Sequence, residues 1–231
     1  MNLSVCVFGD SVSKGVVFDS VLKKYTLLRD CFANLIKSSF PVIIKNYSKF
    51  GCTITKGMEM LCRHQNELSG YDYTVLEFGG NDCDYNWAEV SSEPEQNHNP
   101  KTPVYVFEQK YEELIARIKQ CGSHPVLLTL PPIDAKRYFA WISKGLNPRA
   151  ILNWLGDIDH IYRWHERYNL AVCQVARECQ VPLIDISSAF LETHQYQSLL
   201  CEDGIHPNEE GHRLISNVIG STIEHLQTAM A

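Results

Sequence analysis

Four short polar blocks hold the side chains of this chain that could do chemistry together. They cover residues 9–15, 48–53, 79–82 and 203–207. A serine hydroxyl becomes a useful nucleophile only when a neutral imidazole accepts its proton, and the imidazole needs an acceptor on its other nitrogen. Ser11, His206 and Asp203 can supply these three roles. Together they predict acyl transfer to water.

The same blocks can also supply donors for a negatively charged intermediate. The tetrahedral intermediate of acyl transfer carries an oxyanion that needs fixed hydrogen-bond donors, and losing one donor typically costs about 10²–10³ in rate. The backbone N–H groups of Ser11 and Gly51 and the side-chain amide of Asn81 are the candidates. We expect these three donors to form an oxyanion hole.

The elements that must position these blocks are short apolar runs bounded by Gly, Pro, Asn and Asp. The runs are continuous rather than alternating and are separated by helix-length segments, which is typical of a parallel sheet covered on both faces. In such a sheet ligands bind at the carboxyl ends of the strands, where the polar blocks begin. The five predicted strands are Leu3 to Phe8, Val42 to Tyr47, Tyr73 to Phe78, Val126 to Leu130 and Pro182 to Ile186.

Helical spacing of apolar residues predicts helices over 107–118, 161–179 and 214–223. The last should begin near Pro207-Asn208, favoured by Glu209 and Glu210 in its first turn. A length of 231 residues is compatible with one core, and we expect a single domain over 1–231 with extended loops at about 84–103 and 134–160. Loops of this length in a compact domain are usually functional or disordered.

The four blocks resemble those of the SGNH hydrolase superfamily, also called GDSL esterases/lipases. The resemblance lies in Gly9-Asp10-Ser11 with Gly15, Asn46 through Gly51 to Thr53, Gly79-Gly80-Asn81-Asp82, and Asp203-x-x-His206, which occur in this order over nearly the whole chain. It implies an α/β fold, a three-layer α/β/α sandwich with a flavodoxin-like five-stranded parallel sheet. It also implies Ser11 as nucleophile, His206 as general base and acid, Asp203 as its orienting partner, and Gly51 and Asn81 as oxyanion donors. No metal or cofactor is expected.

Candidates for the substrate pocket lie beside these blocks and in the aromatic segment that follows Leu130. We expect Asp10, Asp82, Pro131, Tyr138 and Trp141 to line the pocket. The alternative for the aromatic residues is packing, which we prefer for Trp164 and Tyr168. The other histidines, His165 among them, are expected to be surface or packing residues.

Composition limits the partners and the compartment. Lys+Arg 21 against Asp+Glu 27 gives 21 − 27 = −6, which argues against nucleic acid as a partner. Nine scattered cysteines without a C-x-x-C pair favour a reducing compartment. No apolar run approaches the roughly 18 residues of a membrane span, and the first run is too short for a signal peptide. We expect a cytoplasmic enzyme without a membrane partner that acts on a small-molecule ester; the sequence carries no signal for an oligomeric state.

Two other readings of the blocks remain open. Asp203, His206 and His212 could bind a metal, although their spacing matches no strong zinc pattern. A flavodoxin-like protein without hydrolase activity could instead hold a phosphate or flavin on Ser11, Ser13 and Lys14. Within the hydrolase reading, acetylated carbohydrate is the first expectation for the substrate, followed by short-chain lipid esters and thioesters.

Overall fold

A parallel sheet of five strands runs through the computed structural model, which describes residues 3–229. The strand order is β4-β1-β5-β6-β7, so the chain starts in the middle of the sheet and extends it in both directions. Parallel pairing sets Val7 against Asn46 and Gly9 against Glu77. The predicted strands and α/β fold class are confirmed. The strands are β1 (Leu3–Gly9), β4 (Val42–Asn46), β5 (Tyr73–Glu77), β6 (His124–Leu128) and β7 (Leu183–Ile184).

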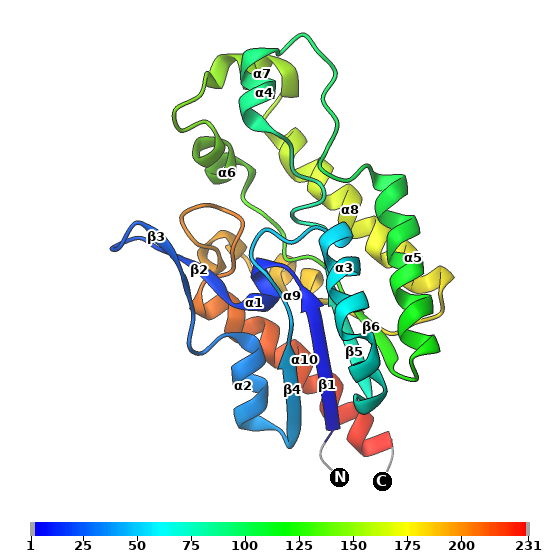
Figure 1. Ribbon diagram of the computed structural model, residues 1–231. Helices are drawn as coiled ribbons and strands as arrows, with labels where there is room; N and C mark the ends of the chain where they lie inside the picture. The colour runs from blue at the N-terminus through cyan, green and yellow to red at the C-terminus, as the bar shows by residue number, and fades with distance from the viewer. Residues whose placement is uncertain (1–2, 230–231) are drawn as a thin grey trace.

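Helices cover both faces of the sheet, which gives the three layers (Figure 1). One layer contains α3 (Ile54–His64), α5 (Val104–Gln120) and α8 (Asp159–Glu178). The other contains α2 (Phe32–Ser39), α9 (Ile186–Glu192) and α10 (Glu209–Ala229). The helices predicted over 107–118, 161–179 and 214–223 are therefore confirmed as α5, α8 and α10. Short 3₁₀ turns lie at η1 (Gln65–Gly70) and η2 (Tyr196–Leu199).

The main core lies between the sheet and the layer of α3, α5 and α8. Phe8, Phe78, Phe107 and Tyr168 are fully buried there. Each such side chain contributes roughly 1.5–3 kcal/mol by leaving water. The buried hydroxyl of Tyr168 donates to the carbonyl of Thr102 at 2.6 Å, so its polar atom is satisfied. The packing role expected for Tyr168 agrees with this position.

An antiparallel hairpin of β2 (Val16–Asp19) and β3 (Lys24–Leu27) projects from the body beside α1 (Figure 1). Sequence analysis does not predict this hairpin. Its strands have four residues each, and most of those residues are half-buried or exposed. Neither strand therefore produces the continuous apolar run that identifies the buried strands.

The segments expected as extended loops at 84–103 and 134–160 instead carry short helices. These are α4 (Trp87–Ser92), α6 (Ala135–Ile142) and α7 (Pro148–Leu155), which with the start of α8 stand over the carboxyl ends of the strands (Figure 1). We call residues 84–103 and 134–160 the cap. It has its own apolar cluster, including Tyr85, Val90, Ile151 and Leu155. Side-chain caps at Asp134 and Asn147 begin α6 and α7.

Three further features bear on the expectations about partners and compartment. None of the helices within residues 3–229 is long and apolar enough to cross a bilayer. Over the same residues, no group of three or more His, Cys, Asp or Glu side chains is placed to hold a metal ion. All nine cysteines are free thiols.

Candidate active site

Ser11 occupies the sharp turn between β1 and α1 (Ser11–Lys14). Asp10 caps this short helix, since its Oδ1 accepts a hydrogen bond from the N–H of Val12 at 2.8 Å. The helix ends at Gly15, whose φ of +79° suits a residue without a Cβ. A Cβ there would lie 2.5 Å from the Cβ of Cys31. The turn therefore fixes Ser11 at the carboxyl end of the central strand.

Folding brings Ser11, His206 and Asp203 into one hydrogen-bonded row. Oγ of Ser11 lies 2.8 Å from Nε2 of His206, and Nδ1 of His206 lies 2.6 Å from Oδ2 of Asp203. All three side chains are buried, Asp203 completely. Burial alone would raise the pKa of Asp203, but the hydrogen bonds and charge of His206 hold it below its ordinary value. A carboxylate at this position favours the tautomer with the proton on Nδ1, which leaves Nε2 free to accept from Ser11.

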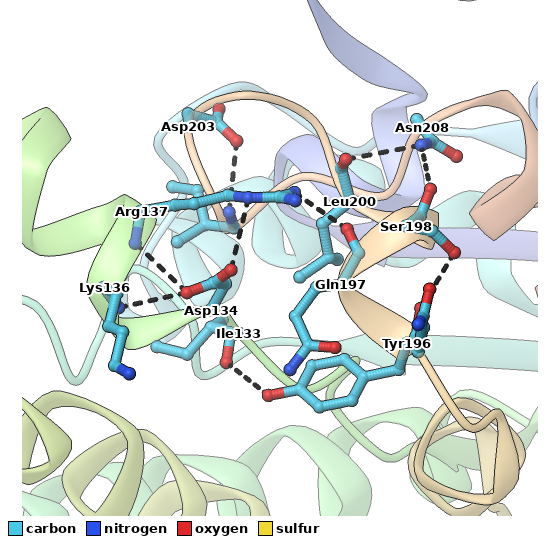
Figure 2. A network of polar contacts seen from close by, with 12 residues as sticks. Ile133, Asp134, Lys136, Arg137, Tyr196, Gln197, Ser198, Leu200, Asp203 and Asn208 are labelled. Atoms are coloured by element: carbon cyan, nitrogen blue, oxygen red, sulfur yellow. Dashed lines mark hydrogen bonds and ion pairs between the residues drawn. The ribbon is translucent and has the colours of Figure 1, made fainter.

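The loop that carries Asp203 and His206 is held in place by the cap (Figure 2). The N–H of Asp134 donates to the carbonyl of Gly204 at 2.8 Å, and Arg137 donates to the carbonyl of Gln197 at 2.8 Å. Oδ1 of Asp203 accepts from the N–H groups of Ile205 and His206, both at 3.1 Å. The residues at the start of α6 therefore hold the loop that carries Asp203 and His206, and they also belong to the cap above it.

The expected oxyanion donors face the same cavity as Ser11. Gly51 has φ +67°, a left-handed conformation that favours glycine. Among the described residues, the N–H groups of Ser11 and Gly51 have no protein acceptor. The amide of Asn81 donates one of its two hydrogens to Oδ2 of Asp10 at 2.9 Å, which leaves the other available. Three donors are thus free to bind a negative oxygen beside Ser11.

A second buried carboxyl group, Glu77 at the end of β5, lies beneath this turn. Oε2 of Glu77 accepts from the hydroxyl of Ser13 at 2.9 Å and from its N–H at 3.2 Å. Burial, and then the charge of Asp10, raise the pKa of Glu77 well above its ordinary value. The backbone N–H of Asp10 also donates to Oε2 of Glu77, at 3.5 Å, so the two carboxyl-bearing residues lie close together. Sequence analysis did not single out Glu77.

A cavity of about 280 Å³ extends from Ser11 beneath the cap. Of the five expected pocket residues, Asp10, Pro131, Tyr138 and Trp141 line it. The expectation for Asp82 is wrong, because Asp82 is completely buried and its carboxylate accepts from the N–H of Ile54 at the start of α3. Burial raises the pKa of Asp82 to about 7. Its role is to hold α3 against the turn that carries Asn81.

Several cavity residues were not singled out from the sequence. Tyr25 of the hairpin and Phe50 flank the ring of His206, with centroids 5.2 and 6.1 Å away. Asp84 links two parts of the cap: its Oδ1 accepts a hydrogen bond from Trp87 at 2.8 Å and one from Tyr138 at 2.7 Å. The signal in the sequence is its acidic side chain two residues after the third block. Further lining residues are Tyr85, Trp87, Leu130, Ile133, Leu155, His160, Ile161, Trp164 and His165. The expectation that Trp164 only packs, and that His160 and His165 are only surface or packing residues, is therefore incomplete.

Comparison with known proteins decides the family. The profile of the GDSL-like lipase/acylhydrolase family matches residues 7–214, most of the chain. The chain belongs to this family. As a family member it is a carboxylic ester hydrolase of the SGNH/GDSL type. None of the curated proteins matches the chain significantly in sequence.

Solved structures of low sequence identity share the fold. A lipase/acylhydrolase from Enterococcus faecalis superposes with TM-score 0.68 at 19% identity, covering 96% of each chain. LAE5, from the metagenome of Lake Arreo, Spain, gives 0.65 at 22% identity over 95% of this chain and 94% of that one. A catalytic mutant of an acetylxylan esterase from Geobacillus stearothermophilus gives 0.63 at 15% identity over 95% and 94%.

Proposed function

We propose that this chain is a serine esterase that hydrolyses small carboxylic esters with short acyl groups through an acyl-enzyme on Ser11. The observation that carries the proposal is the buried hydrogen-bonded row of Ser11, His206 and Asp203. Nucleophile, base and orienting carboxylate stand in the order that acyl transfer requires. Three unpaired donors beside Ser11 complete the set.

In the first half of the reaction, Oγ of Ser11 attacks the acyl carbon while Nε2 of His206 takes the hydroxyl proton. The carbonyl oxygen becomes an oxyanion, which accepts hydrogen bonds from the N–H groups of Ser11 and Gly51 and from the amide of Asn81. The bond from the acyl carbon to the alcohol oxygen then breaks. His206 returns its proton to that oxygen, so that alcohol leaves and the acyl group stays on Ser11.

In the second half, water takes the place of the alcohol. Nε2 of His206 removes a proton from the water as its oxygen attacks the acyl carbon, and the oxyanion forms again on the same donors. Collapse breaks the bond to Oγ of Ser11, and His206 gives Ser11 its proton back. The products are a carboxylic acid and an alcohol, and the enzyme is restored.

The cavity supports acetylated carbohydrate as the substrate class. A volume of about 280 Å³ suits a short acyl group with a small alcohol and is too small for a long lipid chain lying wholly inside. The walls combine aromatic faces, such as Trp87 and Trp141, with polar groups such as Asp84. Aromatic faces with a few placed polar groups suit a sugar ring that carries O-acetyl groups.

The phosphate-binding alternative is not favoured. Ser13, which would hold a phosphate, donates its hydroxyl to the buried carboxyl of Glu77. The turn also carries the buried carboxyl of Asp10, and negative groups repel an anion. The cytoplasmic location stays a prediction from composition.

Labelling with a fluorophosphonate tests the proposal. We expect wild-type protein to be labelled at Ser11 and to hydrolyse p-nitrophenyl acetate, and Ser11→Ala to lose both properties. Ser48→Ala is a matched control, because the Ser48 hydroxyl is buried, has no hydrogen-bond partner among residues 3–229 and does not line the cavity. Full esterase activity in Ser11→Ala would contradict the assignment.

A further inference from the structure

His165 faces the active-site cavity from α8. Ile161, Trp164 and His165 are spaced so that they share one face of this helix, and all three line the cavity that Ser11 lines. Only 4% of His165 is exposed. Its position therefore adds a polar ring beside the aliphatic Ile161 and the aromatic Trp164.

Neither ring nitrogen of His165 makes a hydrogen bond to any described residue, and Nδ1 is completely buried. Most buried polar side-chain atoms in proteins have a partner, and leaving one unpaired costs about 1–3 kcal/mol. A phenylalanine or leucine at this position would avoid that cost. The unpaired ring is therefore explained if the substrate brings a partner to Nε2, the ring nitrogen that is not completely buried.

The ring is suited to a neutral partner. Burial lowers the pKa of His165 to about 4, and no charged group contributes to the shift. At neutral pH the ring is uncharged, so one nitrogen donates a hydrogen bond and the other accepts one. A hydroxyl group can pair with Nε2 in either tautomer, because it can donate or accept, whereas a carboxylate or an ammonium would be buried here without a counter-charge.

We propose that His165 recognises a hydroxyl group in the non-reacting part of the ester, which makes the preferred substrate an ester of a hydroxylated molecule rather than a plain alkyl ester. This inference rests on the proposed esterase function and extends it from the reacting atoms to the substrate class. His165 acts on binding and orientation, while the chemistry stays with Ser11 and His206. A site built to hydrogen-bond a hydroxyl discriminates against an analogue that lacks it, because the site is then left unpaired.

Two pairs of esters test this proposal and show on which side of the ester the hydroxyl lies. Glyceryl monoacetate against propyl acetate varies the alcohol, and ethyl 2-hydroxypropanoate against ethyl propanoate varies the acyl group. We expect the wild type to prefer the hydroxylated member of at least one pair. His165→Phe should lower kcat/KM for that member by about tenfold and leave its hydroxyl-free partner nearly unchanged. His165→Gln, which can still donate and accept, should recover part of the preference.

The stability of His165→Phe distinguishes a role of His165 in substrate recognition from a role in packing. His165→Phe removes an unpaired buried polar group, so we expect its unfolding midpoint to equal or exceed that of the wild type. His212→Phe is the control for the hydroxyl preference. His212 is buried and its Nε2 has no partner within residues 3–229, but it does not line the cavity, so this variant should keep the wild-type preference.

The proposal is overturned if His165→Phe leaves both preferences unchanged, or if it slows all four esters equally while destabilising the fold. A wild-type protein that hydrolyses none of the four esters or p-nitrophenyl acetate would instead contradict the proposed function itself.

Discussion

The side-chain amide of Asn81 donates a hydrogen bond to Oδ2 of Asp10 over 2.9 Å. This contact joins the turn after β5 to the turn after β1. An amide nitrogen carries two hydrogens, so the bond to Asp10 fixes the direction of the second one. Asp10, which also caps the helix of Ser11, therefore positions both the nucleophile and one oxyanion donor.

Removing the donor itself gives the first prediction. We expect Asn81→Ala to lower kcat for p-nitrophenyl acetate by about 10²–10³ with little change in KM, because the oxyanion exists only after attack by Ser11. Asp10→Asn should have a smaller effect in the same direction, since its one acceptor oxygen can keep the contact to Val12 or the contact to Asn81, but not both. Steady-state kinetics of both variants checks this. A change confined to KM would argue against an oxyanion role for Asn81.

Glu77 gives a prediction about stability and pH. Because the pKa of Glu77 is raised in the folded protein, the fold keeps this proton at pH values where the unfolded chain has released it. The free energy of unfolding that Glu77 contributes therefore falls as pH rises above the ordinary value of a glutamate. Glu77→Gln cannot ionise, yet its amide oxygen can still accept from Ser13. We expect this variant to become more stable relative to the wild type as pH increases.

Denaturant unfolding of both proteins at several pH values from 5 to 9, a range about the ordinary carboxyl and imidazole values, measures this difference. Glu77→Gln should also retain esterase activity within about threefold, since the carboxyl group of Glu77 takes no part in the proposed steps. A stability difference that shrinks with increasing pH would show that Glu77 is ionised in the fold.

The four chemical blocks and the sheet were predictable because each depends on local sequence. A buried strand needs a continuous apolar run, and the polar turn after it marks its carboxyl end. Ser11, Asn81 and His206 could be placed on one edge for this reason. The helices of the cap could not be predicted, because with six to eight residues they are too short to show a clear helical period of apolar residues. Asp134 and Asn147-Pro148 are nevertheless helix-start signals.

Residues whose role depends on tertiary position could not be found in this way. His165 lies in the middle of a long amphipathic helix, where its spacing indicates only that it faces inward. That it meets a cavity rather than another side chain depends on the cap, which covers that part of α8. Asp82 shows the opposite case: its block was identified correctly, but its carboxylate accepts from the N–H of Ile54 and does not line the cavity.

Asp84 accepts hydrogen bonds from two cap residues that line the cavity, Trp87 and Tyr138, which gives a third prediction. Tyr138→Phe removes the donor of a 2.7 Å hydrogen bond to Oδ1 of Asp84 and leaves the ring in place. Hydrogen bonds to charged groups contribute about 1.5–3 kcal/mol, and this bond is part-buried. We expect a matching loss of unfolding free energy and a raised KM. Tyr162→Phe is the control, since its hydroxyl has no hydrogen-bond partner within residues 3–229 and does not line the cavity.

Trp141 connects the cap to the hairpin at the side of the cavity, which gives a fourth prediction. Its ring packs edge-on to Phe18, with centroids 4.5 Å apart, and lies 6.2 Å from the ring of Tyr25. Nζ of Lys144 covers the ring at 3.5 Å from its centroid. Trp141→Ala removes this wall, so we expect the ratio of kcat/KM for p-nitrophenyl octanoate to that for the acetate to rise by about tenfold.

Trp154→Ala separates this widening from a general loosening of the cap. Trp154 packs against Tyr85 at 4.9 Å between centroids and donates to the carbonyl of Gln96 at 3.2 Å, but it does not line the cavity. Both variants should lose stability by about 1–3 kcal/mol, because each removes a large, partly buried aromatic side chain. Only Trp141→Ala should change the acyl-length preference. An equal change in both variants would mean that the cap as a whole sets acyl length, rather than the ring of Trp141.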